Sequence, residues 1–317
     1  DDRILELTKE NLSQRNNRFF IEGDPGAIMM VEFARNTREE VDSVTTAMIK
    51  ALMDEGYGYA YPVLRNSDMS KAWELRKAGL GVLGNMKGDG RTVSLIEDTS
   101  VRVEDLPAYM DDFAKLLAAH GKDSVYHAHI GTGELHIRPV LNLKDPADVE
   151  LFRTIGLETA QLVKKYRGSL SGEHGDGRLR GEFIPLILGE ENYKLLKDLK
   201  AAWDPDNILN PGKIVDTPMM NTFLRYEPGT ITPQLETIYD FSSTDGIIRA
   251  AEKCNGSGDC RKSLLIGGTM CPTFMVTMDE DKCTRARANI LREFLSIKDG
   301  DPWDHREIYD ILDLCVG

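Results

Sequence analysis

Residues 126–138 read Tyr126-His127-Ala128-His129-Ile130-Gly131-Thr132-Gly133-Glu134-Leu135-His136-Ile137-Arg138, and this stretch predicts a β-hairpin with its turn at residues 131–134. If Ile130 pairs with Leu135, His129 lies directly opposite His136. Directly opposite residues have Cβ atoms about 4.5–5.5 Å apart. Two imidazoles at that separation can share one divalent ion, with metal–nitrogen distances of about 2.0–2.1 Å for zinc.

The same register pairs His127 with Arg138 on the same face of the hairpin. Three of the six histidines of the chain, His127, His129 and His136, lie within the ten residues 127–136. Sheet histidines that make ordinary hydrogen bonds are the alternative interpretation, but this density and the facing pair favour a metal site.

A third metal ligand is expected from the glycine-rich loop, residues 171–177 (SGEHGDG). Its glycines let Glu173 and His174 approach a site closely, because the backbone there carries few side chains. Two histidines and one carboxylate are used by catalytic metals with open positions, and they suit zinc, manganese and iron alike. A surface turn is the alternative. A phosphate cradle is disfavoured, because no Lys-Ser/Thr follows in P-loop spacing.

Strands and helices alternate along the first two hundred residues. This pattern, with the hairpin, predicts an α+β fold: ferredoxin-like antiparallel sheets with helices on one face. A small, mostly helical segment is expected after it. The predicted strands are 27–34, 57–64 and 92–97, and the predicted helices are 38–54, 68–79, 103–119, 146–166, 190–202 and 284–297.

The composition is that of a globular protein, with 41% hydrophobic and 29% charged residues among 317. Its net charge of −13 argues against a nucleic-acid surface, which needs clustered Lys and Arg. No apolar run is long enough for a transmembrane helix, and no secretory signal is visible. The chain opens without methionine, so we expect a fragment of something longer.

Three motifs in order carry a resemblance to a known family: residues 127–139 (HAHIGTGELHIRP), 168–181 (GSLSGEHGDGRLRG) and 203–214 (WDPDNILNPGKI). Residues 1–217 resemble the C-terminal cap domain of FAD-linked oxidases of the vanillyl-alcohol-oxidase type. That family includes D-lactate dehydrogenase, the glycolate oxidase flavin subunit and D-2-hydroxyglutarate dehydrogenase. The resemblance implies that most of the FAD is bound by an N-terminal domain outside these residues, so this chain alone should bind FAD poorly.

The resemblance also implies roles for individual residues. His129, His136 and Glu173 match the family's divalent-metal ligands, and His174 matches its proposed general base. Arg76, in the sequence WELR of residues 73–76, matches the arginine that holds the substrate carboxylate; a solvated helix-face cation is the alternative. Asn210 matches a position near the flavin, with a turn asparagine before proline as the alternative.

All five cysteines lie in the last quarter of the chain, which indicates a local metal or cluster site. Cys254, Cys260 and Cys271, the last followed by proline, resemble the start of a ferredoxin-type [4Fe-4S] domain fused behind such flavin oxidases. The second cysteine motif of that domain would begin at Cys315. Cys283 could serve as the fourth ligand. A zinc site, or three reduced thiols, are the alternatives.

These observations predict three parts: a substrate-binding cap domain (1–217), a linker (218–249) and a truncated iron–sulfur segment (250–317). The expected function is FAD-dependent oxidation of an (R)-2-hydroxy acid, with electrons passed to iron–sulfur clusters. The expected partners are the FAD-binding domain and an electron acceptor, and the expected location is cytoplasmic or peripheral at the inner membrane. A non-catalytic metal-binding module that docks an electron-transfer partner is the competing hypothesis.

Overall fold

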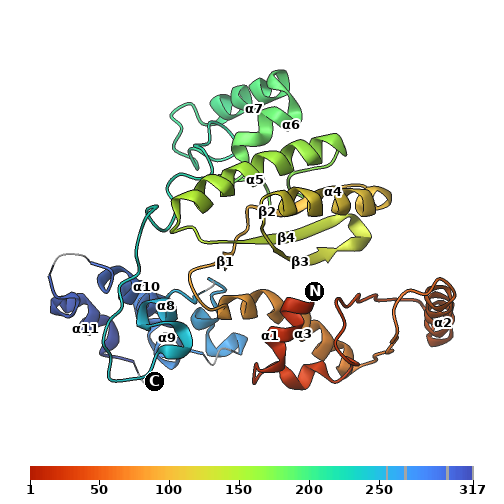
Figure 1. The fold of residues 1–317 in the computed structure, drawn as a ribbon, viewed down its shortest axis with the longest axis horizontal. Coiled ribbons are helices and arrows are strands. Elements are labelled where there is room, and N and C mark those ends of the chain that lie inside the picture. Colours follow the sequence, from red (N-terminus) through yellow and green to blue (C-terminus); the bar gives the residue numbers. More distant parts are fainter. Residues whose placement is uncertain (255, 268–269, 298–299, 316–317) are drawn as a thin grey trace. The chain divides into compact units, whose positions relative to one another are not determined.

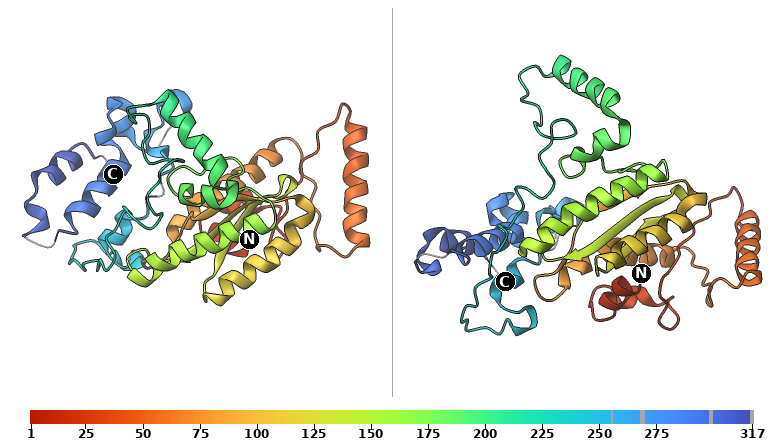
Figure 2. Two further views of the ribbon diagram at one scale, coloured as in Figure 1. Left: turned by 90° about the horizontal axis from the view of Figure 1, so that it is seen from above. Right: turned by 45° about the horizontal axis from the view of Figure 1, so that its top comes forward.

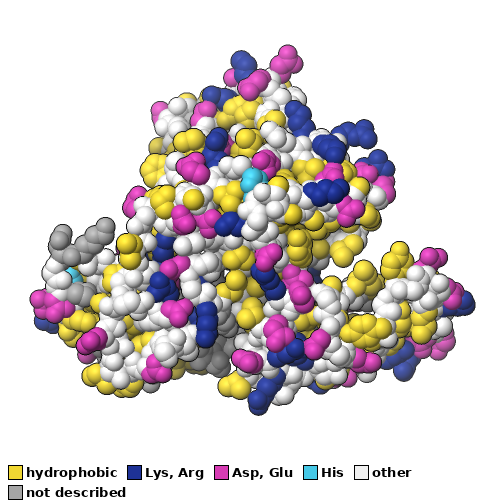
Figure 3. Space-filling view, viewed as in Figure 1, with side chains coloured by type: hydrophobic (Ala, Val, Ile, Leu, Met, Phe, Trp, Pro, Cys, Tyr) yellow, Lys and Arg dark blue, Asp and Glu magenta, His cyan; other side chains and the backbone are white. Residues whose placement is uncertain are grey.

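The computed structural model describes residues 1–254, 256–267, 270–297 and 300–315 (Figure 1). The chain forms two compact units, Asp1–Leu83 and Gly84–Gly317, and each is described by itself. The division at residues 217 and 249 stays a prediction. Within the described ranges, no helix combines the length and apolar character that crossing a bilayer requires. Basic and acidic side chains are interspersed on the face shown in Figure 3.

The first unit is helical. Its helices are α1 (Asp2–Lys9), α2 (Arg38–Asp54) and α3 (Ser67–Val82). The predicted helix at 38–54 is confirmed at both ends. A capping box formed by Thr37 and Glu40 explains why it begins at residue 38. Helix α1 packs on α3 through Ile4, whose side chain lies 3.1 Å from the position of a Cβ on Gly79. Glycine at that position therefore sets the close approach of the two helices.

The strands predicted at 27–34 and 57–64 are wrong. Residues 1–83 are all described, and none of them is in a strand. A strand is stabilised by hydrogen bonds to a neighbouring strand, and neither segment has one in this unit. Gly56 and Gly58 have positive φ, and Pro62 lacks an N–H, so the second segment turns rather than extends.

The second unit is built on a small antiparallel sheet of β1 (Arg91–Thr92), β2 (Ile96–Ser100), β3 (Ser124–His129) and β4 (Glu134–Leu141). Strand β4 is central: β3 pairs along one side of it, and β1 and β2 pair along the other. The predicted strand at 92–97 is therefore two short strands, while the predicted hairpin is β3–β4.

Helices α4 (Leu106–Ala119) and α5 (Pro146–Lys165) cover one face of this sheet (Figures 1 and 2). Alternate residues of β4, such as Leu135 and Ile137, point to these helices and pack in one core with Tyr109 and Phe113. Burying each such side chain contributes about 1.5–3 kcal/mol. The predicted α+β class, with helices on one face, is confirmed. The other face of β4 carries Glu134, His136 and Arg138.

The rest of the second unit is helical and irregular. Its α-helices are α6 (Ile184–Leu188), α7 (Glu190–Trp203), α8 (Ile247–Ala251), α9 (Pro272–Thr277), α10 (Thr284–Phe294) and α11 (Arg306–Leu312).

A buried lysine joins the helical region to the loops near the sheet. The Lys144 ammonium, only 6% exposed, lies 2.9 Å from Asp89 and 2.8 Å from Glu252. Arg249 donates to both oxygens of Asp89, at 2.8 and 2.7 Å. These ion pairs hold α8 against the loop that precedes β1.

Candidate functional site

The register of the hairpin differs from the prediction. His127 pairs with His136, and His129 pairs with Glu134. The pairing is shifted by two residues, which leaves every side chain on its predicted face, whereas a shift of one would have reversed the faces. His129 is therefore diagonal to His136 rather than opposite, yet their ring centroids are only 5.1 Å apart.

Gly133 fixes this register. Residues Ile130–Thr132 form a 3-10 turn that ends at Gly133, with φ of 76°. A Cβ at Gly133 would lie 1.9 Å from the carbonyl oxygen of Val101, and the Val101 N–H donates to the Gly133 carbonyl at 3.0 Å. Only glycine combines this backbone conformation with so close an approach.

Asp98 anchors the glycine-rich loop to the sheet. It lies at an irregularity in the β2–β4 pairing, between Glu97 and Thr99, with φ of 87°, and its side chain is fully buried. The backbone N–H groups of Glu173 and His174 donate to its two carboxylate oxygens at 2.9 and 2.8 Å.

Two further contacts complete this anchor. The Ser171 hydroxyl donates to the Asp98 carboxylate, and the N–H of Gly172 donates to the Asp98 carbonyl at 2.7 Å. The extra residue at this point of β2 therefore directs one carboxylate out of the ladder and onto the loop.

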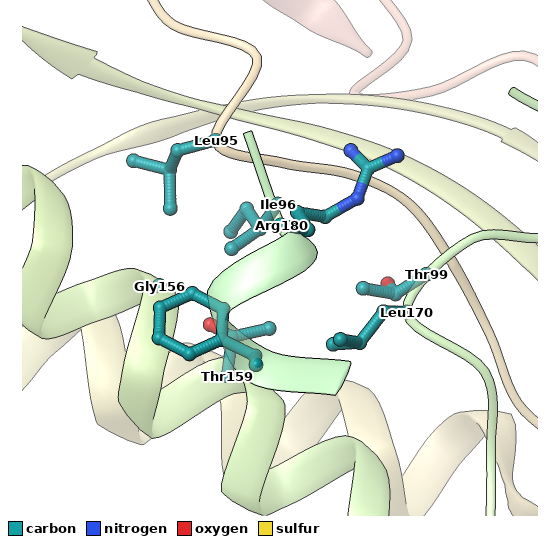
Figure 4. A pocket seen from close by; sticks show the side chains of 8 residues that line it. Leu95, Ile96, Thr99, Gly156, Thr159, Leu170 and Arg180 are labelled. Atoms are coloured by element: carbon teal, nitrogen blue, oxygen red, sulfur yellow. The ribbon is translucent and has the colours of Figure 1, made fainter. Parts of the chain in front are cut away.

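Arg180 also holds the glycine-rich loop. Its guanidinium donates to the carbonyls of Glu97 and Gly175, at 2.7 and 2.9 Å, and lies 3.6 Å from the Asp98 carboxylate. In Figure 4 the guanidinium points away from Gly156 and Thr159 of α5. Its side chain is 7% exposed, so this cation is part of the interior and fixes the end of the loop.

The loop places Glu173 among three histidines. Glu173 Oε1 lies 3.1 Å from His174 Nε2, 3.6 Å from His136 Nε2 and 3.7 Å from His129 Nε2. Asp98, His136, Glu173 and His174 also offer ligand atoms that all lie within 4.8 Å of one another. Glu173 thus lies beside both predicted histidine ligands and the predicted base, on the face of the sheet that α4 and α5 do not cover.

These distances can be compared with those of a metal site. Four ligands placed tetrahedrally at zinc distances of about 2.0–2.1 Å are separated from one another by about 3.4 Å. The contacts of Glu173 Oε1 with His136 and His129, at 3.6 and 3.7 Å, are close to that separation. Imidazole nitrogens and a carboxylate oxygen are also the right donors for a divalent transition metal. The residues fit such an ion.

Burial and neighbouring charges shift the pKa values in the site. Burial lowers the pKa of His136 and so favours the neutral imidazole, the form that binds metals. Burial, followed by the nearby Asp98 and Glu173 carboxylates, raises the pKa of Glu134 to about 7. Burial acts in the same direction on Asp98, but the hydrogen bonds from Ser171, His174 and Glu173 lower its pKa to about 2.

Arg138 extends the polar face beyond His136. Its guanidinium donates to Glu97 Oε1 at 2.5 Å, and both side chains are mostly buried. Burial alone would raise the pKa of Glu97, but the bond from Arg138 lowers it overall. The Arg138 cation is therefore balanced within the sheet.

The other predicted site residues lie on other elements of the chain. Arg76 is on α3 in the first unit, with its guanidinium 5.6 Å from the Trp73 ring centroid. Asn210 is exposed in a turn, with φ of 50°, and accepts from Lys213 at 3.1 Å. Cys260 and Cys271 are buried in one cluster, whereas Cys254 is half-buried.

Sequence reasoning missed Asp98, Glu134 and Arg180. A signal existed for Asp98, because Glu97-Asp98-Thr99 is a run of three polar residues directly after the apolar pair Leu95-Ile96. Neighbouring polar residues in a strand that borders the core suggest a bulge or a buried polar contact. Arg180 gave no such signal.

Residues 1–214 match the family described as FAD linked oxidases, C-terminal domain. Among relatives, the D-2-hydroxyglutarate dehydrogenases of Pseudomonas putida and Escherichia coli are each 32% identical, over 308 and 320 residues. Both alignments cover 94% of this chain and 30% of the relative. The glycolate oxidase subunit GlcD of Bacillus subtilis is 27% identical over 141 residues, which is 44% of this chain and 29% of that protein.

The chain spans about 30% of the length of these two dehydrogenases. Those alignments extend beyond residue 214, since they cover 94% of the chain. The family match itself ends before the cysteines, so their iron–sulfur role stays a prediction.

Proposed function

The chain belongs to the FAD-linked oxidases, whose C-terminal domain its residues 1–214 form, and we propose that it is the substrate-binding part of a dehydrogenase that oxidises an (R)-2-hydroxy acid. Its substrate would be of the glycolate, D-lactate or D-2-hydroxyglutarate type. The observation that carries the proposal is the position of Glu173 Oε1, 3.1–3.7 Å from the Nε2 atoms of His174, His136 and His129.

His129, His136 and Glu173 would hold a divalent ion, either zinc, manganese or iron. A bound ion of this kind supplies Lewis-acid chemistry that lowers the pKa of a coordinated hydroxyl. Asp98 and Arg180 hold the glycine-rich loop and so orient Glu173. Asp98 also accepts from the backbone N–H of His174, which fixes the position of that residue in the loop.

His174 is proposed to accept the proton of the substrate hydroxyl. Its side chain is 47% exposed, so a substrate can reach it, and its Nε2 lies beside the carboxylate of Glu173. General bases of this kind contribute about 10²–10⁴-fold to turnover.

Arg76 is proposed to hold the substrate carboxylate, since a guanidinium can bind both carboxylate oxygens at once. Asn210 is proposed to lie near the flavin. Bound FAD would supply the hydride-accepting chemistry, and we propose that a domain outside these residues would hold most of it.

Electrons are proposed to leave through a [4Fe-4S] centre that uses Cys254, Cys260 and Cys271, toward an acceptor that docks on the protein. We propose a cytoplasmic location, with peripheral association at the inner membrane as the variant.

Flavin reduction tests the proposal. The chain is studied together with its flavin-binding domain, and several 2-hydroxy acids are mixed with it in a stopped-flow instrument while flavin absorbance is followed. We expect bleaching by an (R)-2-hydroxy acid, and a rate about 10²–10⁴-fold lower for His174→Ala. His120→Ala, in a histidine that pairs with Glu158 at 2.7 Å, is the matched control and keeps the rate. An unchanged rate in His174→Ala would remove its role as the base.

The competing function, a non-catalytic metal-binding module for an electron-transfer partner, is separated by the same assay. It predicts metal binding without any flavin bleaching by 2-hydroxy acids. An aromatic-alcohol oxidase is disfavoured, because that chemistry needs neither a carboxylate-binding arginine nor this set of metal ligands.

A further inference from the structure

A later segment of the chain also contacts the glycine-rich loop. This segment, residues 213–223, is here called the strap. The N–H of Ile214 donates to the carbonyl of Gly177, the last residue of the loop, at 2.8 Å. Further along the strap, the N–H of Met220 donates to Glu182 Oε1 at 2.7 Å, and the Met220 side chain is buried in the core. The strap is therefore bonded at two points to the loop and to the residues that follow the loop.

Two further contacts fix the strap in place. Arg178 Nη2 donates to the Thr222 carbonyl at 2.7 Å, and the Arg178 guanidinium lies 5.4 Å from the Phe223 ring centroid. A Cβ on Gly181 would lie 2.3, 3.0 and 3.1 Å from Cγ2, Oγ1 and Cβ of Thr217. Only a residue without a side chain allows the strap to come this close.

Ile214 has a backbone conformation that β-branched residues seldom adopt. Its φ is 65°, and the Val215 N–H donates to the Lys213 carbonyl at 2.7 Å. These are the features of a γ-turn with positive φ, which is rare and strained. Strain of this kind persists only where surrounding contacts impose it, and it is found most often at functional sites. The hydrogen bond from Ile214 to Gly177 is such a contact.

The loop needs support along its whole length, because three of its seven residues are glycines and glycine has the most backbone freedom. Metal ligands have to be held within about 0.5 Å of their working geometry. Asp98 and Arg180 contact the loop as far as residue 176. The strap adds a contact at Gly177, the end that these two side chains do not hold.

We propose that the strap positions the glycine-rich loop, with Ile214 and Gly181 as positioning residues. Ile214 holds the end of the loop, and Gly181 lets the strap lie close enough to do so. This role rests on the proposed function, in which the loop supplies a metal ligand and the base. Asn210, which is proposed to lie near the flavin, is three residues before Lys213. The strap therefore connects the proposed flavin side with the proposed metal site.

A cycle of substitutions in the 317-residue chain tests this role. Gly181→Ala adds a Cβ that requires the strap to move, because three atoms of Thr217 lie within 3.1 Å of it. Thr217→Ala removes the two nearest of these atoms. Its Oγ1 has no hydrogen-bond partner among the described residues, so this substitution loses no hydrogen bond. Thr217→Ala is therefore the control by itself and the rescue when combined with Gly181→Ala.

Two readouts are recorded beside urea unfolding. Hydrogen exchange read by mass spectrometry reports opening of the loop. A Mn²⁺ titration followed by electron paramagnetic resonance reports the proposed site of His129, His136 and Glu173, here called the histidine site. We expect Gly181→Ala to speed loop exchange at least about tenfold and to weaken Mn²⁺ affinity about tenfold.

Thr217→Ala should leave loop exchange and Mn²⁺ affinity unchanged, and the double variant should regain most of what Gly181→Ala loses. A purely structural role would instead lower the free energy of unfolding without changing the Mn²⁺ affinity of the folded chain.

Two substitutions of Ile214 test the strained turn itself. Ile214→Gly keeps the N–H and adopts a positive φ without strain, so loop exchange should stay within about twofold of its original rate. Ile214→Pro has no N–H and fixes φ near −65°, so it should speed loop exchange at least about tenfold. Loop exchange and Mn²⁺ affinity that stay unchanged in both Gly181→Ala and Ile214→Pro would overturn the proposal. Faster exchange with unchanged Mn²⁺ affinity would overturn it as well.

The unsubstituted chain decides the matter if neither variant folds. The amide of Ile214 should then exchange at about the same rate as those of Glu173 and His174, because its bond to Gly177 breaks when the loop opens. Exchange at Ile214 more than about tenfold faster would overturn the proposal. Absence of Mn²⁺ binding by the unsubstituted chain would contradict the proposed metal site, whereas the exchange rates would still decide whether the strap holds the loop.

Discussion

Replacement of Asp98 by asparagine tests how the glycine-rich loop is held. Asparagine keeps the size of the side chain and one acceptor oxygen, but an NH₂ group takes the place of the other. If the amide group occupies the Oδ2 position, it faces the His174 N–H, which now donates there at 2.8 Å, and the Ser171 hydroxyl. The hydrogen bonds from the His174 N–H and the Ser171 hydroxyl to a charged oxygen are then lost. The new NH₂ group also faces the His174 N–H, so two donors lie opposite one another.

The expected effect follows from these contacts. Hydrogen bonds to charged groups contribute about 1.5–3 kcal/mol each, so two of them set an upper value of about 3–6 kcal/mol. The loop is partly exposed and can relax, so we expect the free energy of unfolding to fall by about 2–4 kcal/mol. Loss of a group that orients metal ligands typically weakens metal affinity about 10–100-fold, and we expect this of the histidine site.

Two measurements check this prediction on the isolated chain. Urea unfolding gives the change in stability, and a Mn²⁺ titration followed by electron paramagnetic resonance gives the affinity of the histidine site. Manganese is chosen because carboxylates suit it and thiolates bind it weakly. Asp111→Asn, in an exposed aspartate of α4, is the matched control and changes neither value. If Asp98→Asn also changes neither, Asp98 does not hold the loop and the account of the site is wrong.

Two further predictions concern Gly133 in the hairpin and the ion pairs of Asp89 before β1. Gly133→Ala should lower the free energy of unfolding in urea by about 2–4 kcal/mol, because Gly133 has a positive φ and lies close to the backbone of Val101. Gly131→Ala is the control and should be nearly neutral, because the space around Gly131 is open. Equal effects of the two substitutions would show that Gly133 does not fix the register. Hydrogen bonding from Arg249 lowers the pKa of Asp89 to about 2 from an ordinary 3.8, so its contribution to stability is present above about pH 4 and is lost as the pH falls toward 2. Asp89→Asn should therefore lower stability at pH 5 and have little effect near pH 2, and a difference that does not shrink on acidification would contradict this.

Local signals predicted the helices well. Thr37 and Glu40 mark the start of α2, and the predicted helix at 146–166 is within one residue of α5 at each end. The strands predicted at 27–34 and 57–64 are absent from the structure. A strand needs a neighbouring strand to pair with, and local composition does not reveal whether one is present.

The sequence predicted which residues belong to the candidate site, but not the contacts that bring them together. His129, His136 and Glu173 stood out by type and spacing, and the structure brings them together. The register that does so depends on contact between Gly133 and Val101, and these residues are 32 positions apart in the sequence. The role of Asp98 depends on an irregular sheet pairing. Both are tertiary properties, which local periodicity does not encode.

We propose that His129, His136 and Glu173 hold one divalent ion. A Mn²⁺ titration of the chain and of Glu173→Gln, followed by electron paramagnetic resonance, tests it most directly, with Glu191→Gln on the exposed start of α7 as the control. We expect about one Mn²⁺ per chain at the histidine site, unchanged affinity in the control, and affinity at least about tenfold weaker in Glu173→Gln. Equal Mn²⁺ binding by Glu173→Gln and the unsubstituted chain, or no binding by either, would contradict it.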